Sequence, residues 1–408
     1  MHDALTGLLA QRPVAERETW RSLWDQLDDG SLGQEQAVVL LASLTTRLPG
    51  PETLRALLGS LLERRPAPPV GPWPGAVNIV GTGGGPATFN ISTAAAFVAA
   101  AMGVPVVKTG SRAYTSSLGS VDLLERLGVR LTASYSQTER TLEQYGIAFA
   151  GPFVYPAQLA RLARTVAPLS MKPFGRFLNA LGPFLADLPV AAQVTGVSHT
   201  MPGPELRDLA AGLAGRRIWL TANDRGADEL LGFADNTIHT YGPEGPGGVR
   251  LLPDSLTPAG GSFAALRPVA PADAAEHFLA VLGGTGPATD TVCLNAAALA
   301  VASGHSADWP TAYAAAREAV ATGAARDLVE RMRAAARRPR TPGPVSEVAS
   351  APRRPARTLA APAESPSTSS TRTSGRHAES THRTPQGPPS GRTTPLPTQA
   401  LVPEATHG

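Results

Sequence analysis

The sequence is poor in cysteine and in long apolar runs, and each shortage excludes a class of protein. Cys293 is the sole cysteine among 408 residues, which excludes a disulfide framework and favours a reducing, cytoplasmic compartment. It lies in the apolar run TVCLNAAALA and is interpreted as a small core residue. No stretch approaches the roughly 20 apolar residues of a membrane helix. The first residues also lack the basic start and apolar centre of a signal peptide, so no membrane association is expected.

A net positive charge is lacking outside the last segment. The formal net charge is +3, but residues 339–408 hold eight arginines and four glutamates, which leaves about −1 for the rest. The chain before this segment therefore has no basic footprint, and no nucleic-acid partner is expected. The same segment contains 13 of the 39 prolines and few aliphatic residues. It cannot bury enough apolar surface to offset its chain entropy, so residues 338–408 are predicted to form a disordered tail.

The spacing of apolar residues before this tail predicts two regions. Residues 1–70 carry them at helical spacing and are predicted to form a small helical domain, on which helices of the next region also pack. Residues 71–337 alternate short apolar runs with helical patterns, which indicates an α/β domain with a mostly parallel central sheet. The alanine-rich patterns over 268–335 are interpreted as closing helices.

A glycine-rich loop lies between the first predicted strand and its helix. The strand, Val77–Val80, is followed by the glycines of residues 81–86, where backbone N–H groups can approach a ligand closely. Ser92 or Thr93 is the predicted N-cap of an alanine-rich helix. The free N–H groups at such a helix start attract anions. The competing interpretation is a plain turn without a ligand, since the Walker loop is absent and Pro86 breaks a dinucleotide fingerprint.

A second unit of the same kind favours the ligand-binding interpretation. Val104–Val107 is a predicted strand, followed by Lys108 and by a stretch rich in serine, threonine and glycine. Lysine is rare in this chain, with two against 34 arginines, and a compact ammonium suits a phosphate. Ligands of open α/β sheets bind at the carboxyl ends of the strands, so both loops are expected at one edge. The sequence thus predicts a site for a molecule with more than one phosphate.

An acidic pair follows a later predicted strand, Arg217–Thr221. Asp228 and Glu229 come shortly after it, and adjacent carboxylates at a strand end suit Mg²⁺ that also contacts a diphosphate. By itself such a pair is more commonly a solvated helix start. Asp224 is the competing candidate nearby.

The strings GTGG…TFNIST, VVKTGSR and SLGSVDLLERLG resemble the signature of the anthranilate phosphoribosyltransferases, over roughly residues 20–335. The resemblance implies phosphoribosyl pyrophosphate (PRPP) as donor, Mg²⁺ as cofactor and a homodimer formed through the helical domain. It places the metal on Ser92, Asp228 and Glu229. It also implies a set of donor-binding residues: Gly81, Gly84, Thr88, Asn90, Ser92, Thr93, Lys108, Thr115, Ser116 and Ser120. No covalent nucleophile is implied, and His199 is a weak candidate for a general base that is more commonly structural.

The departures from the family pattern concern the acceptor. The glycine loop lacks the family's aspartate, and KHGNR becomes KTGSR, so Thr109 and Ser111 replace the histidine and asparagine that face anthranilate. The arginine expected at the anthranilate carboxylate falls on Leu169, with Arg164 as a substitute. The predicted acceptor-binding residues are Thr109, Ser111, Leu169 and Asn179.

These departures favour a neutral or cationic acceptor. The sequence also resembles the phosphoribosyltransferases of ribosylated aminoglycoside antibiotics, which act on a hydroxyl of neamine. The first hypothesis, implied by this resemblance, is a Mg²⁺-dependent transferase that moves 5-phosphoribosyl to a hydroxyl of a neamine-type aminoglycoside in antibiotic biosynthesis. The alternative is anthranilate phosphoribosyl transfer for tryptophan biosynthesis. A further alternative is a non-catalytic relative that binds a ligand or a nucleic acid, because the loop aspartate is missing.

Overall fold

The computed structural model describes residues 1–65, 68–110, 112, 118–171, 174–213 and 215–337. The predicted tail, 338–408, lies outside the described residues, as do the predicted site residues Ser111, Thr115 and Ser116. In the described ranges, no helix has the length and apolarity needed to cross a bilayer.

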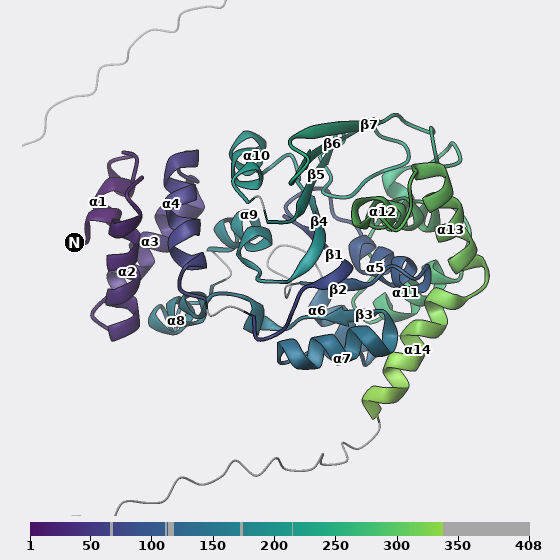
Figure 1. Cartoon of the computed structure of the whole chain (residues 1–408), viewed down its shortest axis with the longest axis horizontal. Coiled ribbons are helices and arrows are strands. Elements are labelled where there is room, and N and C mark those ends of the chain that lie inside the picture. Colours follow the sequence, from purple (N-terminus) through teal and green to yellow (C-terminus); the bar gives the residue numbers. More distant parts are fainter. Residues whose placement is uncertain (66–67, 111, 113–117, 172–173, 214, 338–408) are drawn as a thin grey trace, which may run out of the picture. The chain divides into compact units, whose positions relative to one another are not determined.

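A seven-stranded sheet forms the centre of the α/β region, in the order β3-β2-β1-β4-β5-β6-β7 (Figure 1). The strands from β1 to β5 are parallel to one another, whereas β6 pairs antiparallel with β5 and forms an antiparallel hairpin with β7 at one edge. The bounds are β1 (Trp73–Gly81), β2 (Val106–Lys108), β3 (Ile147–Phe149), β4 (Val190–Gly196), β5 (Arg217–Asn223), β6 (Asn236–Tyr241) and β7 (Gly247–Leu251). The predicted α/β class with a mostly parallel sheet is confirmed, and the hairpin is an addition that the sequence did not predict.

Helices cover both faces of the sheet, as a parallel sheet requires. The helices α5 (Ile91–Ala101) and α12 (Pro287–Ser303) contact β1 from one side, and α9 (Gly175–Leu185) and α10 (Gly203–Ala211) lie on the other side (Figure 1). Around α5 and α12 pack α6 (Ser120–Leu127), α11 (Ala274–Leu282), α13 (Trp309–Ala321) and α14 (Ala324–Arg337). Cys293 is fully buried in α12, in agreement with its interpretation as a core residue.

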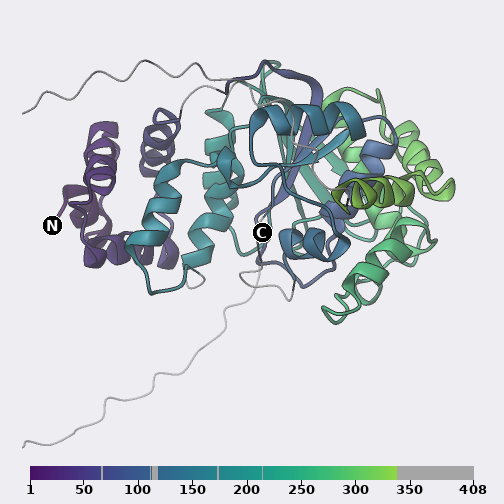
Figure 2. The ribbon, with the colours of Figure 1, turned by 90° about the horizontal axis from the view of Figure 1, so that it is seen from below.

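The N-terminal region is helical, as predicted (Figure 2). It contains α1 (Asp3–Leu9), α2 (Arg17–Asp29), α3 (Gln34–Thr46) and α4 (Pro51–Leu62). These helices share one apolar core with α8 (Ala157–Thr165), α9 and α10, and the stacked Trp20 and Trp24 lie fully buried within it. The boundaries of the predicted domains stay a prediction.

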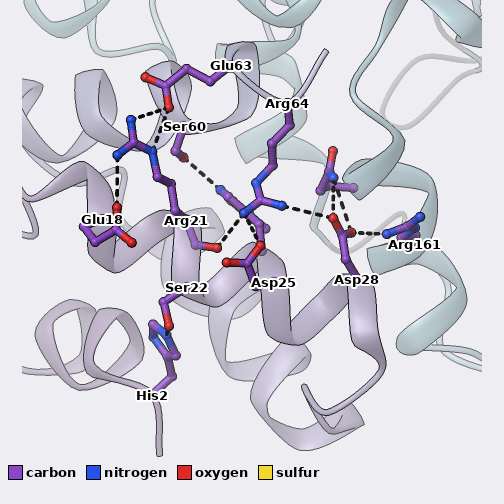
Figure 3. A network of polar contacts seen from close by, with 12 residues as sticks. His2, Glu18, Arg21, Ser22, Asp25, Asp28, Ser60, Glu63, Arg64 and Arg161 are labelled. Atoms are coloured by element: carbon purple, nitrogen blue, oxygen red, sulfur yellow. Dashed lines mark hydrogen bonds and ion pairs between the residues drawn. The ribbon is translucent and has the colours of Figure 1, made fainter. Parts of the chain in front are cut away.

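A polar network joins α2, the end of α4 and α8 (Figure 3). The Arg64 guanidinium donates to Asp28 Oδ2 at 3.1 Å and to the carbonyl of Arg21 at 2.8 Å. Asp28 also accepts from Gln158 Nε2 at 3.0 Å and forms an ion pair with Arg161. Asp28 therefore connects three helices through partly buried, charge-assisted bonds, the stronger class of hydrogen bond.

Candidate active site

The glycine loop begins where β1 ends. Gly83 and Gly84 have φ of +63° and +81°, in the left-handed region that favours glycine. A Cβ atom on Gly84 would also lie 2.6 Å from Thr200 Oγ1, in the segment after β4. The loop is thus held in a conformation that ordinary side chains would disturb, at the carboxyl edge of the parallel strands.

Asp228 and Glu229, here called the acidic couplet, lie against this loop. The Gly83 N–H donates to Asp228 Oδ2 at 2.7 Å, and Thr88 Oγ1 donates to Glu229 Oε1 at 3.0 Å. Asn223, the last residue of β5, shapes the turn before the couplet because its Nδ2 donates to the Glu229 carbonyl at 2.8 Å. The structure therefore brings together loop and couplet, which are about 145 residues apart in the chain.

Glycines on the neighbouring strands leave room for Asp228. A Cβ atom on Gly81, at the end of β1, would lie 2.3 Å from Asp228 Oδ2. One on Gly196, at the end of β4, would lie 1.6 Å from the Asp228 carbonyl oxygen. Asp228 can occupy this position because both strand ends lack a side chain. Asp224, the competing candidate, is exposed and pairs with Arg225 instead.

Lys108 ends β2 and reaches the same cluster. Its side chain is 3% exposed, and its Nζ donates to the Ile79 carbonyl at 2.9 Å and to Ser92 Oγ at 3.3 Å. Burial lowers the pKa of Lys108 to about 8, although the charges of Asp228 and Glu229 act in the opposite direction. A buried ammonium thus lies close to the couplet.

The couplet itself holds more acceptors than its neighbours satisfy. Burial raises the pKa of Asp228, against the effect of the Gly83 N–H, and burial together with the Asp228 charge raises the pKa of Glu229 well above its usual range. Glu229 Oε2 is buried and has no hydrogen-bond partner among the residues that the structure describes. Two close carboxylates with a spare oxygen fit a hard divalent cation.

The helix start beside the couplet differs from the prediction by two or three residues. The N-cap of α5 is Asn90, and Ser92 and Thr93 lie in the first turn. The prediction of Ser92 or Thr93 as N-cap was wrong because the Asn90 carbonyl already accepts from the Ala94 N–H at 3.1 Å, while Ser92 Oγ accepts from Lys108. Thr93 Oγ1 is buried, and no described residue forms a hydrogen bond with it. This register places the Ser92 hydroxyl beside Lys108.

The second loop is described only in part. Ser120 is the first residue of α6, and a Cβ atom on Gly110 would lie 2.1 Å from Ser120 Oγ. Asn90 Nδ2 donates to the Leu118 carbonyl at 3.4 Å, which connects the start of α5 to the residues before α6. The described ends of this loop therefore lie beside the first loop.

The described members of the predicted acceptor set, Thr109, Leu169 and Asn179, differ in their surroundings, and their role stays a prediction. Thr109 is 1% exposed, and its Oγ1 accepts from Asn78 Nδ2 at 3.3 Å within the sheet. Asn179, on α9, lies near the glycine loop, since a Cβ atom on Gly83 would be 3.6 Å from its Nδ2. Leu169 is 51% exposed, and Arg164 is exposed in the last turn of α8.

Polar residues after β4 and Arg176 on α9 lie beside the site, and the sequence analysis did not single out most of them. Ser198 Oγ donates to the Gly83 carbonyl at 2.6 Å, and the Ser198 N–H donates to Thr82 Oγ1 at 3.1 Å. Arg176, in the first turn of α9, donates from Nη2 to the Thr200 carbonyl at 3.2 Å. His199 Nδ1 donates to the Gly226 carbonyl at 3.0 Å, which gives the weak candidate base a structural partner. The cluster of hydroxyl residues in GVSHT was the available signal.

Comparison with known proteins agrees with this geometry. Residues 74–326 match the glycosyl transferase family, a/b domain. An anthranilate phosphoribosyltransferase of Methylobacterium nodulans is 34% identical over 324 residues, which are 78% of this chain and 93% of the relative. One of Desulfitobacterium hafniense is 32% identical over 345 residues, covering 82% and 99%.

Solved structures give the same relationship. The crystal structure of anthranilate phosphoribosyltransferase from Thermus thermophilus has a TM-score of 0.65 and 30% identity, and the match covers 82% of this chain and all of that one. The Saccharomyces cerevisiae enzyme in complex with PRPP and Mg shares the fold, with a TM-score of 0.61 at 23% identity over 74% of this chain and 85% of its own. The chain thus belongs to the anthranilate phosphoribosyltransferase family and is a phosphoribosyltransferase of the pentosyltransferase class.

Proposed function

We propose that this protein transfers the 5-phosphoribosyl group of PRPP to anthranilate and releases diphosphate. The observation that carries the proposal is the convergence of the glycine loop, Lys108 and the acidic couplet at one edge of the sheet. Such a cluster combines backbone N–H donors, a buried cation and carboxylates. A sugar carrying a phosphate and a diphosphate requires this combination.

The residues divide into two roles in this proposal. The loop N–H groups, the first turn of α5 and Lys108 would bind phosphate oxygens and orient the donor. Asp228 and Glu229, with Ser92 nearby, would hold Mg²⁺, which when bound would neutralise charge on the leaving diphosphate. The described residues contain no group of three or more His, Cys, Asp or Glu side chains suited to a metal. Oxygens of substrate and water would therefore complete its shell.

Anthranilate is the acceptor that the relatives support, since their names state this activity. A benzoate needs a cation or several donors, and Leu169 supplies neither. Arg176 offers a guanidinium beside the glycine loop, one helical turn before Asn179. We assign the anthranilate carboxylate to Arg176. The aminoglycoside acceptor has no support among these relatives and enters the experiment as a competing outcome.

The decisive experiment measures the loss of anthranilate fluorescence with PRPP and Mg²⁺, with mass spectrometry of the product. We expect consumption of anthranilate by the wild-type chain and none by the double variant Asp228→Asn, Glu229→Gln. A mass gain of one phosphoribosyl unit on neamine, with anthranilate untouched, would refute the acceptor. Absence of PRPP binding in calorimetry would refute the transferase site itself and support the non-catalytic alternative.

The role of Arg176 has its own test. Arg176→Gln is expected to raise KM for anthranilate by roughly tenfold or more, because a charge-assisted bond to the carboxylate is lost, with KM for PRPP little changed. Arg164→Gln is the comparison variant, since Arg164, exposed on α8, is the rival candidate for the same carboxylate. Equal effects of the two substitutions would remove Arg176 from the acceptor site. The homodimer through α1 to α4 stays a prediction that sedimentation analysis can check.

A further inference from the structure

Two arginines lie at the sheet edge opposite the acidic couplet. Arg65 follows α4, and Arg216 directly precedes β5. The Arg65 Nη1 donates to the Leu185 carbonyl at 2.6 Å, and the Arg216 Nη1 donates to the Leu188 carbonyl at 3.3 Å. The Leu185 carbonyl ends α9, and the Leu188 carbonyl lies in the short connection from α9 into β4. Since β1, β4 and β5 are parallel, this connection marks the amino ends of the strands.

The charges of this arginine pair are poorly compensated. Burial lowers the pKa of Arg216 to about 10, and the positive charge of Arg65 acts in the same direction. Asp187 acts in the opposite direction on both arginines, but in the described part of the chain neither guanidinium forms an ion pair with a carboxylate. The Tyr135 hydroxyl donates a hydrogen bond to the Asp187 backbone carbonyl at 2.9 Å. The two guanidiniums therefore influence each other, and the one nearby carboxylate among the described residues, that of Asp187, forms an ion pair with neither. Within these residues the pair lacks a counter-anion.

Hydrogen-bond donors without acceptors occur in the same place. Within the described ranges of the chain, the buried Arg65 Nε has no hydrogen-bond partner, and neither has the indole N–H of Trp73, which is 5% exposed. Trp73 begins β1 and packs in one cluster with Leu188, and its ring lies 6.5 Å from that of Tyr135. Buried donors in folded proteins are normally satisfied. The surplus here consists of donors and positive charge, which an oxyanion would satisfy.

We propose that Arg65 and Arg216 form a second anion site, separate from the donor site, that binds a small doubly charged oxyanion such as inorganic phosphate. The planar guanidinium suits such a ligand because it can present paired N–H groups to two oxygens. Each side chain keeps part of its surface exposed, so an anion can enter from solvent. The carbonyl bonds to Leu185 and Leu188 already fix both guanidiniums in position.

The test compares thermal unfolding of the full chain in phosphate and in chloride at equal ionic strength. An anion that binds the folded state alone raises Tm with concentration. As phosphate replaces chloride, the Tm of the wild type is expected to rise steadily further above that of Arg216→Gln. The dependence of this difference on phosphate concentration should indicate that the variant binds phosphate roughly tenfold or more weakly. Phosphate binding at the donor site affects both proteins equally and cancels in this difference.

Arg217→Gln is the matched control, because Arg217 is the next residue and donates to the Ala302 carbonyl at 3.0 Å instead. Its Tm difference from wild type should not depend on phosphate. Arg65→Gln should behave like Arg216→Gln and serves if the latter does not fold. A phosphate-independent difference for both pair variants would overturn the proposal. So would crystals of the wild-type protein soaked in selenate that show no anomalous peak between the two guanidiniums, whereas a peak there would support it.

Discussion

Replacing Lys108 with methionine should abolish donor binding and stabilise the protein at the same time. Lys108 is almost fully buried, and its ammonium is held among the Ile79 carbonyl, Ser92 and the acidic couplet. The proposed function needs this charge for phosphate. Without a ligand, the same charge destabilises the folded state, because it has been removed from water.

The size of this destabilisation follows from the pKa of Lys108. Burial lowers the pKa of Lys108 from 10.5 to about 8, and one pKa unit corresponds to about 1.4 kcal/mol. At neutral pH the charged lysine therefore lowers the free energy of unfolding by about 3 kcal/mol relative to a neutral side chain. Methionine leaves the Ile79 carbonyl without its partner, which costs about 1–2 kcal/mol. The expected net gain is about 1–2 kcal/mol, or a rise in Tm of roughly 2–4 °C.

The dependence on pH separates this explanation from a general packing effect. Between pH 8 and 10.5 the unfolded chain binds more protons at this lysine than the folded one, so the stability of the wild type rises with pH. The advantage of Lys108→Met should be constant below pH 8 and shrink above it. Urea denaturation at several pH values measures the advantage, and calorimetry with PRPP and Mg²⁺ measures the lost binding. A variant that is less stable than wild type by the same amount at every pH would refute the reasoning.

Three further predictions concern the couplet and the helical region. Gly81→Ala should displace the Asp228 carboxylate from the Gly83 N–H and lower the free energy of unfolding, measured in denaturant, by about 2–3 kcal/mol. The control Gly182→Ala places a methyl group in open space on α9 and should raise the free energy of unfolding by up to about 1 kcal/mol. With EDTA present, burial and the charge of Asp228 keep the pKa of Glu229 raised, so the stability of the wild type should fall as pH rises above the usual carboxyl range. Glu229→Gln should flatten that decline. Asp28→Asn should lower the free energy of unfolding by about 1–2 kcal/mol, because it weakens the bonds of residue 28 to Arg64 and Arg161. Asp29→Asn, at an exposed position, should lower it clearly less. Equal losses of stability in thermal unfolding would contradict a special role for Asp28.

Buried parallel strands were predictable from the sequence because both of their faces are covered. The apolar runs at Val77–Val80 and Arg217–Thr221 correspond to β1 and β5, which extend a few residues further. The edge hairpin of β6 and β7 was not predictable in this way. Its strands, NTIHTY and GGVRL, mix polar and apolar residues and are partly exposed, so they carry no continuous apolar signal.

The site was predictable where its residues sit in short, ordered motifs. The glycine loop, Lys108 and the couplet each follow a predicted strand, and the rule that parallel strands end at one edge places them together. Ser198, Thr82 and Arg176 escaped the analysis because their roles come from contacts across the chain. Serine, threonine and arginine at such positions have no distinctive spacing, and single hydroxyl residues after a strand are common in loops.

The position of Asp228 depends on its neighbours more than on its own segment. Its carboxylate lies where a side chain on Gly81 would be, and its carbonyl lies where one on Gly196 would be. These glycines end β1 and β4, which pair with each other at that point, and Thr82 and Ser198 fasten the two strand ends just beyond them. Three chain segments thus share one space that admits a side chain from one segment alone. The acidic couplet can approach the glycine loop because β1 and β4 end in glycines, which have no side chain. These two glycines are therefore as much a part of the proposed metal site as the carboxylates.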